Sequence, residues 1–560
     1  MCSACRCRGC CSRSRSTRCC SCSAGSTSAR PSATSATSPT SSTGRRTGRT
    51  PVKPELGIVA VTLVALATLG IGAYGWRFSR TTSDFFVASR SVRPALNASA
   101  IGGEYLSAAS FLGVAGLVLA FGTDMLWYPV GWTAGYLLLL VLVAAPLRRS
   151  GAYTLPDFAE ARLESRTVRR ISSLLVVGIG WLYLMPQFQG AGLSLGTVAG
   201  TEPWVGGVVV AAVVLVNVFF GGMRSITFVQ AFQYWLKLTA LLVPAMFLLS
   251  VWAGDGATSP ADPSVTTGGM GGDLWASPLT SASAHPLYTT YSIIVATFLG
   301  TMGLPHVVVR FYTNPDGRTA RRTTLVVLAL LGLFYVLPPV YGALGRLYAP
   351  DLVAAGATDT VVLELPSRMV PGLGGELLSA LTAAGAFAAF LSTSSGLTIA
   401  VAGVISQDVM GRRFRGVRAF QAAAVVAVSV ALVLALAAEG VGVARAVGLA
   451  FAVAASTFCP LLVLGIWWRR LTDAGAITGL LVGGGLAGGA VVVTLLDATP
   501  GGWLGTMASQ PAAVTVPVAF LVMVLVSLLT PKRVPRHISR TMVRLHTPEH
   551  VELDRGPFPL

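Results

Sequence analysis

The sequence has few charged residues. Asp, Glu, Lys and Arg make up only 11% of its 560 residues, whereas 53% are hydrophobic and the mean hydropathy is +0.68. Soluble globular proteins carry about 25% charged residues, so a soluble enzyme or binding module is excluded and an integral membrane protein is expected. The net charge of +18 does not indicate nucleic-acid binding, because the basic residues stand in short loops between apolar runs, where membrane topology explains them.

Cysteine is almost absent beyond residue 22. Eight of the nine cysteines precede that point, and the ninth, Cys459, lies in an apolar segment. The head, residues 1–54, is rich in Cys, Ser and Arg and has no acidic residue. Its Cys-x-x-Cys spacing leaves a zinc knuckle or a disulfide knot open, but it has no histidine, few core-forming residues and no signal-peptide core. We expect a disordered head, or an over-extended start of the reading frame.

Apolar stretches of bilayer-spanning length recur thirteen times and predict an all-α membrane protein. They lie at about 56–76, 95–121, 126–147, 171–199, 204–220, 228–252, 286–304, 323–345, 374–405, 419–438, 446–468, 474–496 and 512–530.

Lys and Arg gather in the loops after the odd-numbered spans and in the tail. Because positive loops stay in the cytoplasm, this predicts a cell-membrane protein with its N-terminus outside and its C-terminus inside. The predicted parts are the head, a first helix and linker (55–94), a first repeat (95–253), an extracellular loop (254–285), a second repeat (286–468), two further helices (469–530) and a cytoplasmic tail (531–560).

Two spans contain helix-breaking residues in corresponding places. The second span carries Gly102 and Gly103 beside Glu104, and the seventh carries Gly303 and Pro305. Free backbone carbonyls at membrane depth are tolerated only around a cavity. A broken helix opening each of two five-helix halves predicts an inverted-repeat secondary transporter with its site near the midplane.

Polar residues inside the spans mark the candidate site. The ninth span has five hydroxyls within residues 392–398, and we expect Ser392 and Thr393 to bind a small hard cation, although helix packing is the alternative. Glu104 and Lys237 fall well inside the bilayer and are candidate functional residues, unless they simply pair with each other or with the backbone. Gln187 and its neighbours, beside Pro186, line a solute cavity or satisfy the backbone around the proline.

Two polar residues near the inner end of the seventh span favour another role. His306 and Arg310 follow Pro305 closely, and an anchoring role at the membrane surface is favoured over proton relay or carboxylate binding.

Four blocks of sequence resemble the sodium:solute symporters, and within them the cation/acetate (monocarboxylate) symporters. The similarity covers about residues 56–530. The blocks are SDFFVASRSVRPALNASAIGGEYLSAASFLG (83–113), GGMRSITFVQAF (221–232), GTMGLPHVVVRFYTNPDGRTARR (300–322) and LSTSSGLTIAVAGVISQD (391–408).

The resemblance implies a LeuT-like core of ten helices and a Na⁺ site. The site would use the hydroxyls of Ser392 and Thr393 and carbonyls near Gly103 and Leu106. Sugar and proline members have an acidic residue where this chain has Gln230, which leaves coupling to H⁺ open.

The predicted function is cation-coupled import of a small monocarboxylate such as acetate, with Na⁺ as the expected ion and no organic cofactor. The alternatives are another solute (an amino acid, a vitamin or a sugar), coupling to H⁺ and, remotely, a membrane-embedded enzyme or a transporter-like sensor. Tyr105, Glu104, Lys237 and Gln230 are candidate substrate or coupling residues. Gln187, Gly303 and Pro305 complete that set. The expected partners are the solute and the lipid bilayer, without nucleic acid.

Overall fold

The structure is a computed structural model that describes residues 54–76, 92–279, 283–410, 416–438, 442–549 and 551. The head, with its possible zinc knuckle or disulfide knot, lies outside the described residues except for Pro54. In the described part, secondary structure is helical apart from one isolated bridge between Thr267 and Met270.

The first half of the bundle begins with α1 and ends with one long interrupted helix. Its elements are α1 (Pro54–Trp76), α3 (Pro94–Tyr105), the π-helix η2 (Ala109–Gly113), α4 (Val114–Phe121), η3 (Thr123–Leu126), α5 (Trp127–Leu138), η4 (Leu139–Val143), α6 (Ala144–Ser150), α7 (Leu155–Leu163), α8 (Arg166–Ala199) and α9 (Pro203–Gly254).

The second half follows the loop that contains the short α10 (Gly272–Ala276). Its elements are α11 (Pro286–Gly303), α12 (Pro305–Val309), η5 (Arg310–Thr313), α13 (Gly317–Tyr335), α14 (Leu337–Tyr348), α15 (Asp351–Ala354), η6 (Thr358–Thr360), α16 (Val361–Met369), α17 (Leu373–Val404), η7 (Ile405–Val409), α18 (Val417–Ala437) and α19 (Val443–Trp467). The remaining elements are α20 (Asp473–Leu495), α21 (Gly502–Ser509), α22 (Ala512–Leu529), η9 (Pro531–Arg533) and α23 (Ile538–His546).

Every predicted span corresponds to a helix or to a helix with a bend. Over the described residues, eleven helices are long and apolar enough to cross a membrane, and a pair bent by 72°, Pro94–Tyr105 with Ala109–Phe121, makes a twelfth. The predicted span at 204–220 is the shorter apolar helix Pro203–Phe219, the first part of α9, which is interrupted at Gly222. Gly222 has φ +60°, where a residue without Cβ is least strained.

Both predicted helix breaks are present. The first falls after Tyr105, where Leu106 leaves the helical conformation with ψ 89°. The second falls at Leu304, which is extended (φ −74°, ψ 118°) between α11 and α12. The proline that follows lacks an N–H and starts the next helix with its fixed φ.

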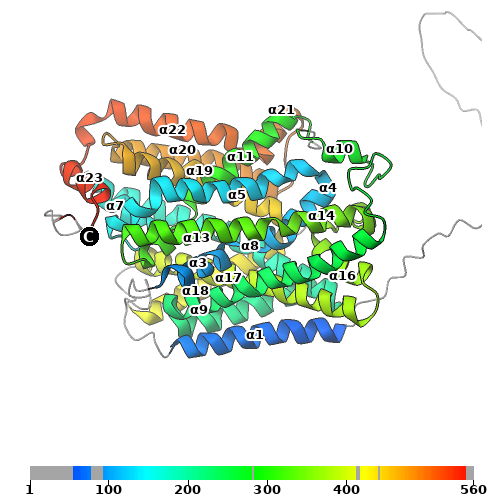
Figure 1. The fold of residues 1–560 in the computed structure, drawn as a ribbon. Coiled ribbons are helices and arrows are strands. Elements are labelled where there is room, and N and C mark those ends of the chain that lie inside the picture. The colour runs from blue at the N-terminus through cyan, green and yellow to red at the C-terminus, as the bar shows by residue number, and fades with distance from the viewer. Residues whose placement is uncertain are drawn as a thin grey trace, which may run out of the picture. The chain divides into compact units, whose positions relative to one another are not determined.

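The long helices run side by side, and some of the short helices lie at the ends of the bundle. In Figure 1, α7 and α23 lie at one end, whereas α10 and α21 lie at the other. The end with α7 and α23 carries Arg148, Arg149, Arg469 and Arg470 and is called the basic end below. The positive-inside rule predicts that this end is cytoplasmic.

Glycine brings α11 against α19. A Cβ on Gly300 would lie 2.4 Å from the carbonyl oxygen of Phe451, and one on Gly303 would lie 2.3 Å from that of Ala454. A side chain cannot fit at these distances. Glycine therefore allows the two backbones to pack directly against each other here, as is common between membrane helices.

The loop between the halves is held by one arginine of α14. Arg346 donates from Nε to the carbonyl of Pro260 (3.0 Å) and from Nη2 to those of Val265 (2.6 Å) and Met270 (2.7 Å). Thr267 donates back to the Arg346 carbonyl at 3.2 Å. The loop predicted at 254–285 therefore has a fixed conformation where these bonds hold it.

A candidate cation and solute site at the helix breaks

The helix predicted to carry the site lies inside the bundle. The most apolar stretch of α17 and η7 is buried throughout. Ala, Gly, Ser and Thr dominate this segment, and small side chains let neighbouring helices approach closely. The Thr393 hydroxyl donates to the carbonyl of Glu104 at 2.7 Å, and that of Ser392 donates to the carbonyl of Ala389 at 3.0 Å. The break in α3 therefore packs directly against the predicted hydroxyls.

Lys237 of α9 reaches the same point. Its fully buried ammonium donates to the carbonyl of Gly103, to the carbonyl of Leu106 (2.8 Å) and to the Ser392 hydroxyl (2.9 Å). An ammonium has three N–H donors, and all three have an acceptor here. The residues predicted from the resemblance as Na⁺ ligands, Ser392, Gly103 and Leu106, are thus the three acceptors of this side chain.

Glu104 pairs with an arginine and not with Lys237. Its Oε2 accepts from Nε of Arg310 at 2.5 Å, and the two side chains are 3% and 1% exposed. Arg310 also donates to the Gln230 side chain and to the Thr227 hydroxyl (3.0 Å). Gln230 donates in turn to the carbonyl of Ser392 at 2.9 Å. One connected polar network therefore joins η5, which follows the second break, to α3, α9 and α17.

The preferred interpretation of Arg310 and His306 as surface anchors was wrong. Both are buried, each 1% exposed. The extended residue Leu304 interrupts the helix, and Arg310 follows the short α12, where it meets Glu104 instead of the membrane surface. The surface position was inferred by counting residues along the span, and such a count does not show the change of chain direction at Leu304.

The oxygen set does not fit Na⁺ while the ammonium is present. A Na⁺ ion would need the Gly103 and Leu106 carbonyls and the Ser392 hydroxyl, which Lys237 already uses. Two unit positive charges about 4 Å apart repel by about 4 kcal/mol at an effective dielectric constant of about 20. The hydroxyl of Thr393 is likewise engaged with Glu104. Binding of Na⁺ at Ser392 and Thr393 stays a prediction, and it requires Lys237 to leave.

Gln187 satisfies the backbone at the first break. Its Oε1 accepts from the amide of Ala108 at 3.0 Å, and its Nε2 donates to the carbonyl of Tyr183 at 3.2 Å. Breaking a helix leaves such amides without their intrahelical acceptor. Of the two roles considered for Gln187, the contacts are those of backbone satisfaction.

An aromatic cluster surrounds the two breaks. Its members are Tyr105, Trp132, Tyr136, Tyr183, His306 and Phe451. Phe451 lies at the centre, with ring centroids 6.4 Å from Tyr105, 5.7 Å from Trp132 and 5.9 Å from Tyr183. Tyr136 packs on Tyr105 at 4.7 Å, and His306 packs on Tyr183 at 5.1 Å. The Tyr105 hydroxyl is also within hydrogen-bonding distance of Thr301 (2.9 Å), so residues from both halves close this cluster.

Three buried members of the cluster have polar atoms without a partner. Among the described residues, Nε1 of Trp132, the hydroxyl of Tyr136 and both ring nitrogens of His306 form no hydrogen bond. Buried polar groups are nearly always paired, and each exception calls for an explanation. An anionic solute that accepts hydrogen bonds is the kind of molecule these groups can bind.

Gly303 and Pro305 position the second break and have no polar side chain. Gly303 packs on the Ala454 carbonyl, and Pro305 begins α12. Their contribution is geometric, since they place His306 beside Tyr183 and Arg310 beside Glu104.

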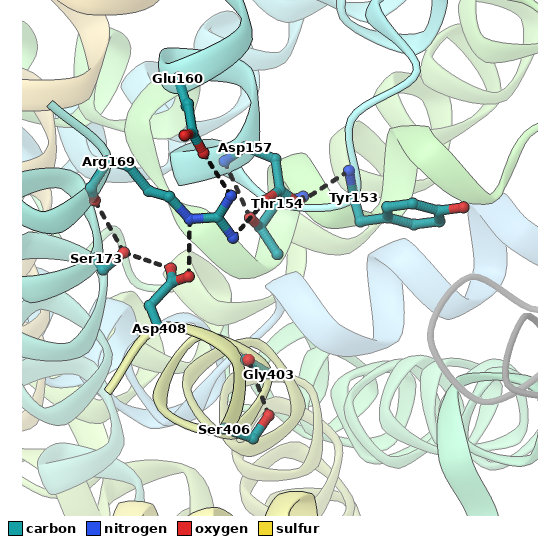
Figure 2. A network of polar contacts seen from close by, with 9 residues as sticks. All are labelled: Tyr153, Thr154, Asp157, Glu160, Arg169, Ser173, Gly403, Ser406 and Asp408. Atoms are coloured by element: carbon teal, nitrogen blue, oxygen red, sulfur yellow. Dashed lines mark hydrogen bonds and ion pairs between the residues drawn. The ribbon is translucent and has the colours of Figure 1, made fainter. Parts of the chain in front are cut away.

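An ion-pair network at the basic end joins α7, α8 and η7 (Figure 2). The Arg169 guanidinium lies 2.9 Å from Asp157, 2.6 Å from Glu160 and 2.8 Å from Asp408. Asp408 also accepts from the Ser173 hydroxyl at 2.5 Å. Burial raises the pKa of the Asp157 carboxyl above its usual range, although Arg169 opposes the shift. Thr154 and Asp157 also form the capping box that starts α7.

A cavity of about 610 Å³ has no residue of the two breaks in its walls. Its walls come from α4, α8, α9, α18 and α19 and from the segment around Asp359, and they are mainly apolar. Phe188 and Gln189, the neighbours of Gln187 that were predicted to line a solute cavity, do line this one, whereas the other predicted site residues do not. We therefore place the candidate site at the breaks, where the unpaired donors and the charged residues meet.

The prediction from sequence brought together most of the polar network but omitted several members. Gln230, Lys237, Glu104, Ser392 and Thr393 meet as expected near the first break. Arg310 and Thr227 of the network and Trp132, Tyr136 and Phe451 of the aromatic cluster were not proposed as site residues. An arginine five residues after a helix-breaking proline was the one available signal, and aromatic residues in apolar spans give none, because they are ordinary in such segments.

Comparison with known proteins agrees with this arrangement. The sequence pattern of the sodium:solute symporter family matches residues 85–483. The chain is 32% identical over 516 residues to an uncharacterized symporter, YwcA, of Bacillus subtilis (strain 168), covering 89% of this chain and 98% of the relative.

Two solved structures share the fold at low sequence identity. A Na⁺-coupled sialic acid symporter in a substrate-bound, outward-open state aligns with a TM-score of 0.63 and 15% identity, covering 84% of this chain and 98% of the other. Mhp1, a nucleobase-cation-symport-1 family transporter in a closed conformation, aligns with a TM-score of 0.53 and 15% identity, covering 83% and 99%. The predicted LeuT-like inverted-repeat fold is thereby confirmed.

Proposed function

Because the chain belongs to the sodium:solute symporter family and is a cation-coupled symporter and not an enzyme, we propose that its solute is a small monocarboxylate such as acetate. The observation that carries this proposal is the set of unpaired polar groups of Trp132, Tyr136 and His306 beside the two helix breaks. A carboxylate accepts several hydrogen bonds, and its short alkyl group packs against the neighbouring aromatic rings.

The charges around the cluster favour a solute of this class. Arg310, a buried arginine four residues after His306 of the cluster, is paired with Glu104. An anion is therefore bound by neutral N–H and O–H donors, which suits one carboxylate better than a phosphate or a dicarboxylate. A sugar carries many hydroxyls, each needing a polar partner, whereas the unpaired polar atoms of the cluster are few and the rest of its surface is ring faces.

Transport proceeds by alternating access, and the contacts suggest which parts separate. At the basic end, the Arg169 network ties α7 and α8 to η7. Opening to that side requires these pairs to break, while α3, α9 and α17 stay connected through Lys237 and Thr393. A solute and a cation are coupled when each has a different affinity for the two open states.

Uptake of labelled acetate into proteoliposomes tests the solute. We expect accumulation that propionate and pyruvate inhibit and that glucose and proline do not. Sodium and proton gradients are imposed separately, so that the driving ion is measured and not assumed. Absence of acetate uptake under both gradients would refute the proposed solute and leave the family and fold unchanged.

A matched pair of tyrosine variants tests the cluster. Tyr136→Phe removes a hydroxyl that has no partner among the described residues, so we expect unchanged stability and a KM for acetate raised roughly tenfold or more, the effect of one hydrogen bond to a charged group. Tyr234→Phe removes a hydroxyl that donates to the Leu330 carbonyl outside the cluster, so it should lower stability and leave KM unchanged. The reverse pattern would place the solute elsewhere.

A further inference from the structure

We propose that the ammonium of Lys237 is the resident cation of the site between α3, α9 and α17, and that this site therefore does not bind Na⁺. The inference rests on the proposed function only in treating this point as the cation site of a symporter. It does not depend on which solute is carried.

The coordination of the ammonium supports this assignment. Its acceptors come from two elements, the broken α3 (Gly103 and Leu106) and α17 (Ser392), while the lysine itself belongs to α9. Two of the acceptors are backbone carbonyls beside the break in α3, of the kind that otherwise bind a metal ion. The lysine thus joins three helices through one positive charge, as a cation bound between these helices would.

The surrounding charges do not support a second cation. Lys237 and Arg310 each bring a positive charge within hydrogen-bonding reach of this network, and Glu104 is its one acidic side chain among the described residues. Arg310 already neutralises Glu104. A Na⁺ ion would therefore enter a site with an uncompensated ammonium and no free carboxylate, and Gln230 supplies none.

Removal of the ammonium should leave a vacant set of oxygens. The carbonyls of Gly103 and Leu106 and the hydroxyl of Ser392 remain when Lys237 is replaced by alanine, and Gln230 and Arg310 donate their hydrogen bonds to other acceptors. Carbonyl and hydroxyl oxygens are ligands that hard cations prefer. Lys237→Ala should therefore create a Na⁺ site that the wild-type protein lacks.

The test is the melting temperature of the purified protein in NaCl, KCl and choline chloride at equal ionic strength, without solute. We expect the wild-type value to be the same in all three salts. Lys237→Ala should gain a saturable rise of roughly 2 °C or more that is selective for Na⁺, because a ligand that binds only the folded state stabilises it. Lys237→Ser, which offers a further oxygen, should show the same gain and serves if the alanine variant does not fold.

Two controls assign the response to this site. Adding Ser392→Ala to Lys237→Ala should abolish the gain, because it removes one of the vacated oxygens. Lys532→Ala changes an exposed lysine in η9 and should leave the protein as insensitive to Na⁺ as the wild type.

A Na⁺-selective stabilisation of the wild-type protein that Ser392→Ala abolishes would overturn the proposal, since it would show that Na⁺ displaces Lys237. Folded lysine variants without any response to Na⁺ would also overturn it, because the oxygens would then not form a cation site. No step of the test uses acetate, so a failure of the proposed solute would be recognised separately by the uptake assay.

Discussion

Replacing Glu104 by glutamine should destabilise the protein far more than the same replacement in an ion pair that is partly exposed to solvent. Glu104 and Arg310 are almost fully buried and 2.5 Å apart. Removing one partner of a buried pair leaves an uncompensated charge and costs about 3–5 kcal/mol. Glu364→Gln is the matched control, since Glu364 pairs with Arg368 at 2.6 Å with side chains 23% and 21% exposed, and such a pair contributes about 0–1 kcal/mol.

The melting temperature in detergent, followed by tryptophan fluorescence, measures this difference. Unfolding entropies of about 2 cal/mol/K per residue imply a shift of about 1 °C per kcal/mol for a chain of this length. We therefore expect a fall of about 3–5 °C for Glu104→Gln and of less than about 1 °C for Glu364→Gln. Combining Glu104→Gln with Arg310→Met should recover part of the loss. Equal shifts for the two single variants would refute the view that Glu104 balances a buried arginine.

The remaining predictions concern packing, the first break and the basic end. Gly396→Ala should cost about 1–3 kcal/mol in the same assay, because its Cβ would lie 2.1 Å from Glu104 Oε1, whereas Gly403→Ala, with nothing within 4 Å, should cost little. Thr393→Val should lower the rate of acetate uptake roughly tenfold or more by freeing the Glu104 carbonyl, and Thr398→Val, whose hydroxyl has no partner in the described part of the chain, should not. Burial raises the pKa of Asp157, so the stability that this carboxyl contributes is present below its ordinary pKa of 3.8 and is lost as pH rises through the raised value. The melting temperature of the wild type relative to Asp157→Asn should therefore fall as pH increases over that range. A constant difference between the two melting temperatures would contradict this.

The spans could be predicted because apolar length is set by the bilayer and does not depend on the partners of a helix. The first break followed from Gly102 and Gly103 and the second from Gly303 and Pro305, because the backbone chemistry of glycine and proline acts locally. The direction of Arg310 after the second break was not predictable, since it depends on how α12 packs against α3.

The side-chain contacts at the first break could not be predicted from the sequence either. The sequence made Glu104 and Lys237 candidate functional residues, with pairing to each other or to the backbone as the alternative; Lys237 does bond backbone carbonyls, whereas Glu104 pairs with Arg310. Neither the Arg310–Glu104 pair nor the three acceptors of Lys237 can be deduced from spacing, because each joins elements more than a hundred residues apart. Hydroxyls at 392 and 393 identified the region because polar groups are rare in spans, whereas the aromatic cluster gave no such contrast.

The attachment of the loop after α9 to Arg346 has a practical consequence for spectroscopy. A probe on a free surface loop reports mainly the motion of that loop. Thr266 is exposed, but its neighbours Val265 and Thr267 are hydrogen-bonded to Arg346 near the end of α14. A spin label or fluorophore at Thr266 would therefore follow α14, and distances measured from it would record helix displacement during the transport cycle.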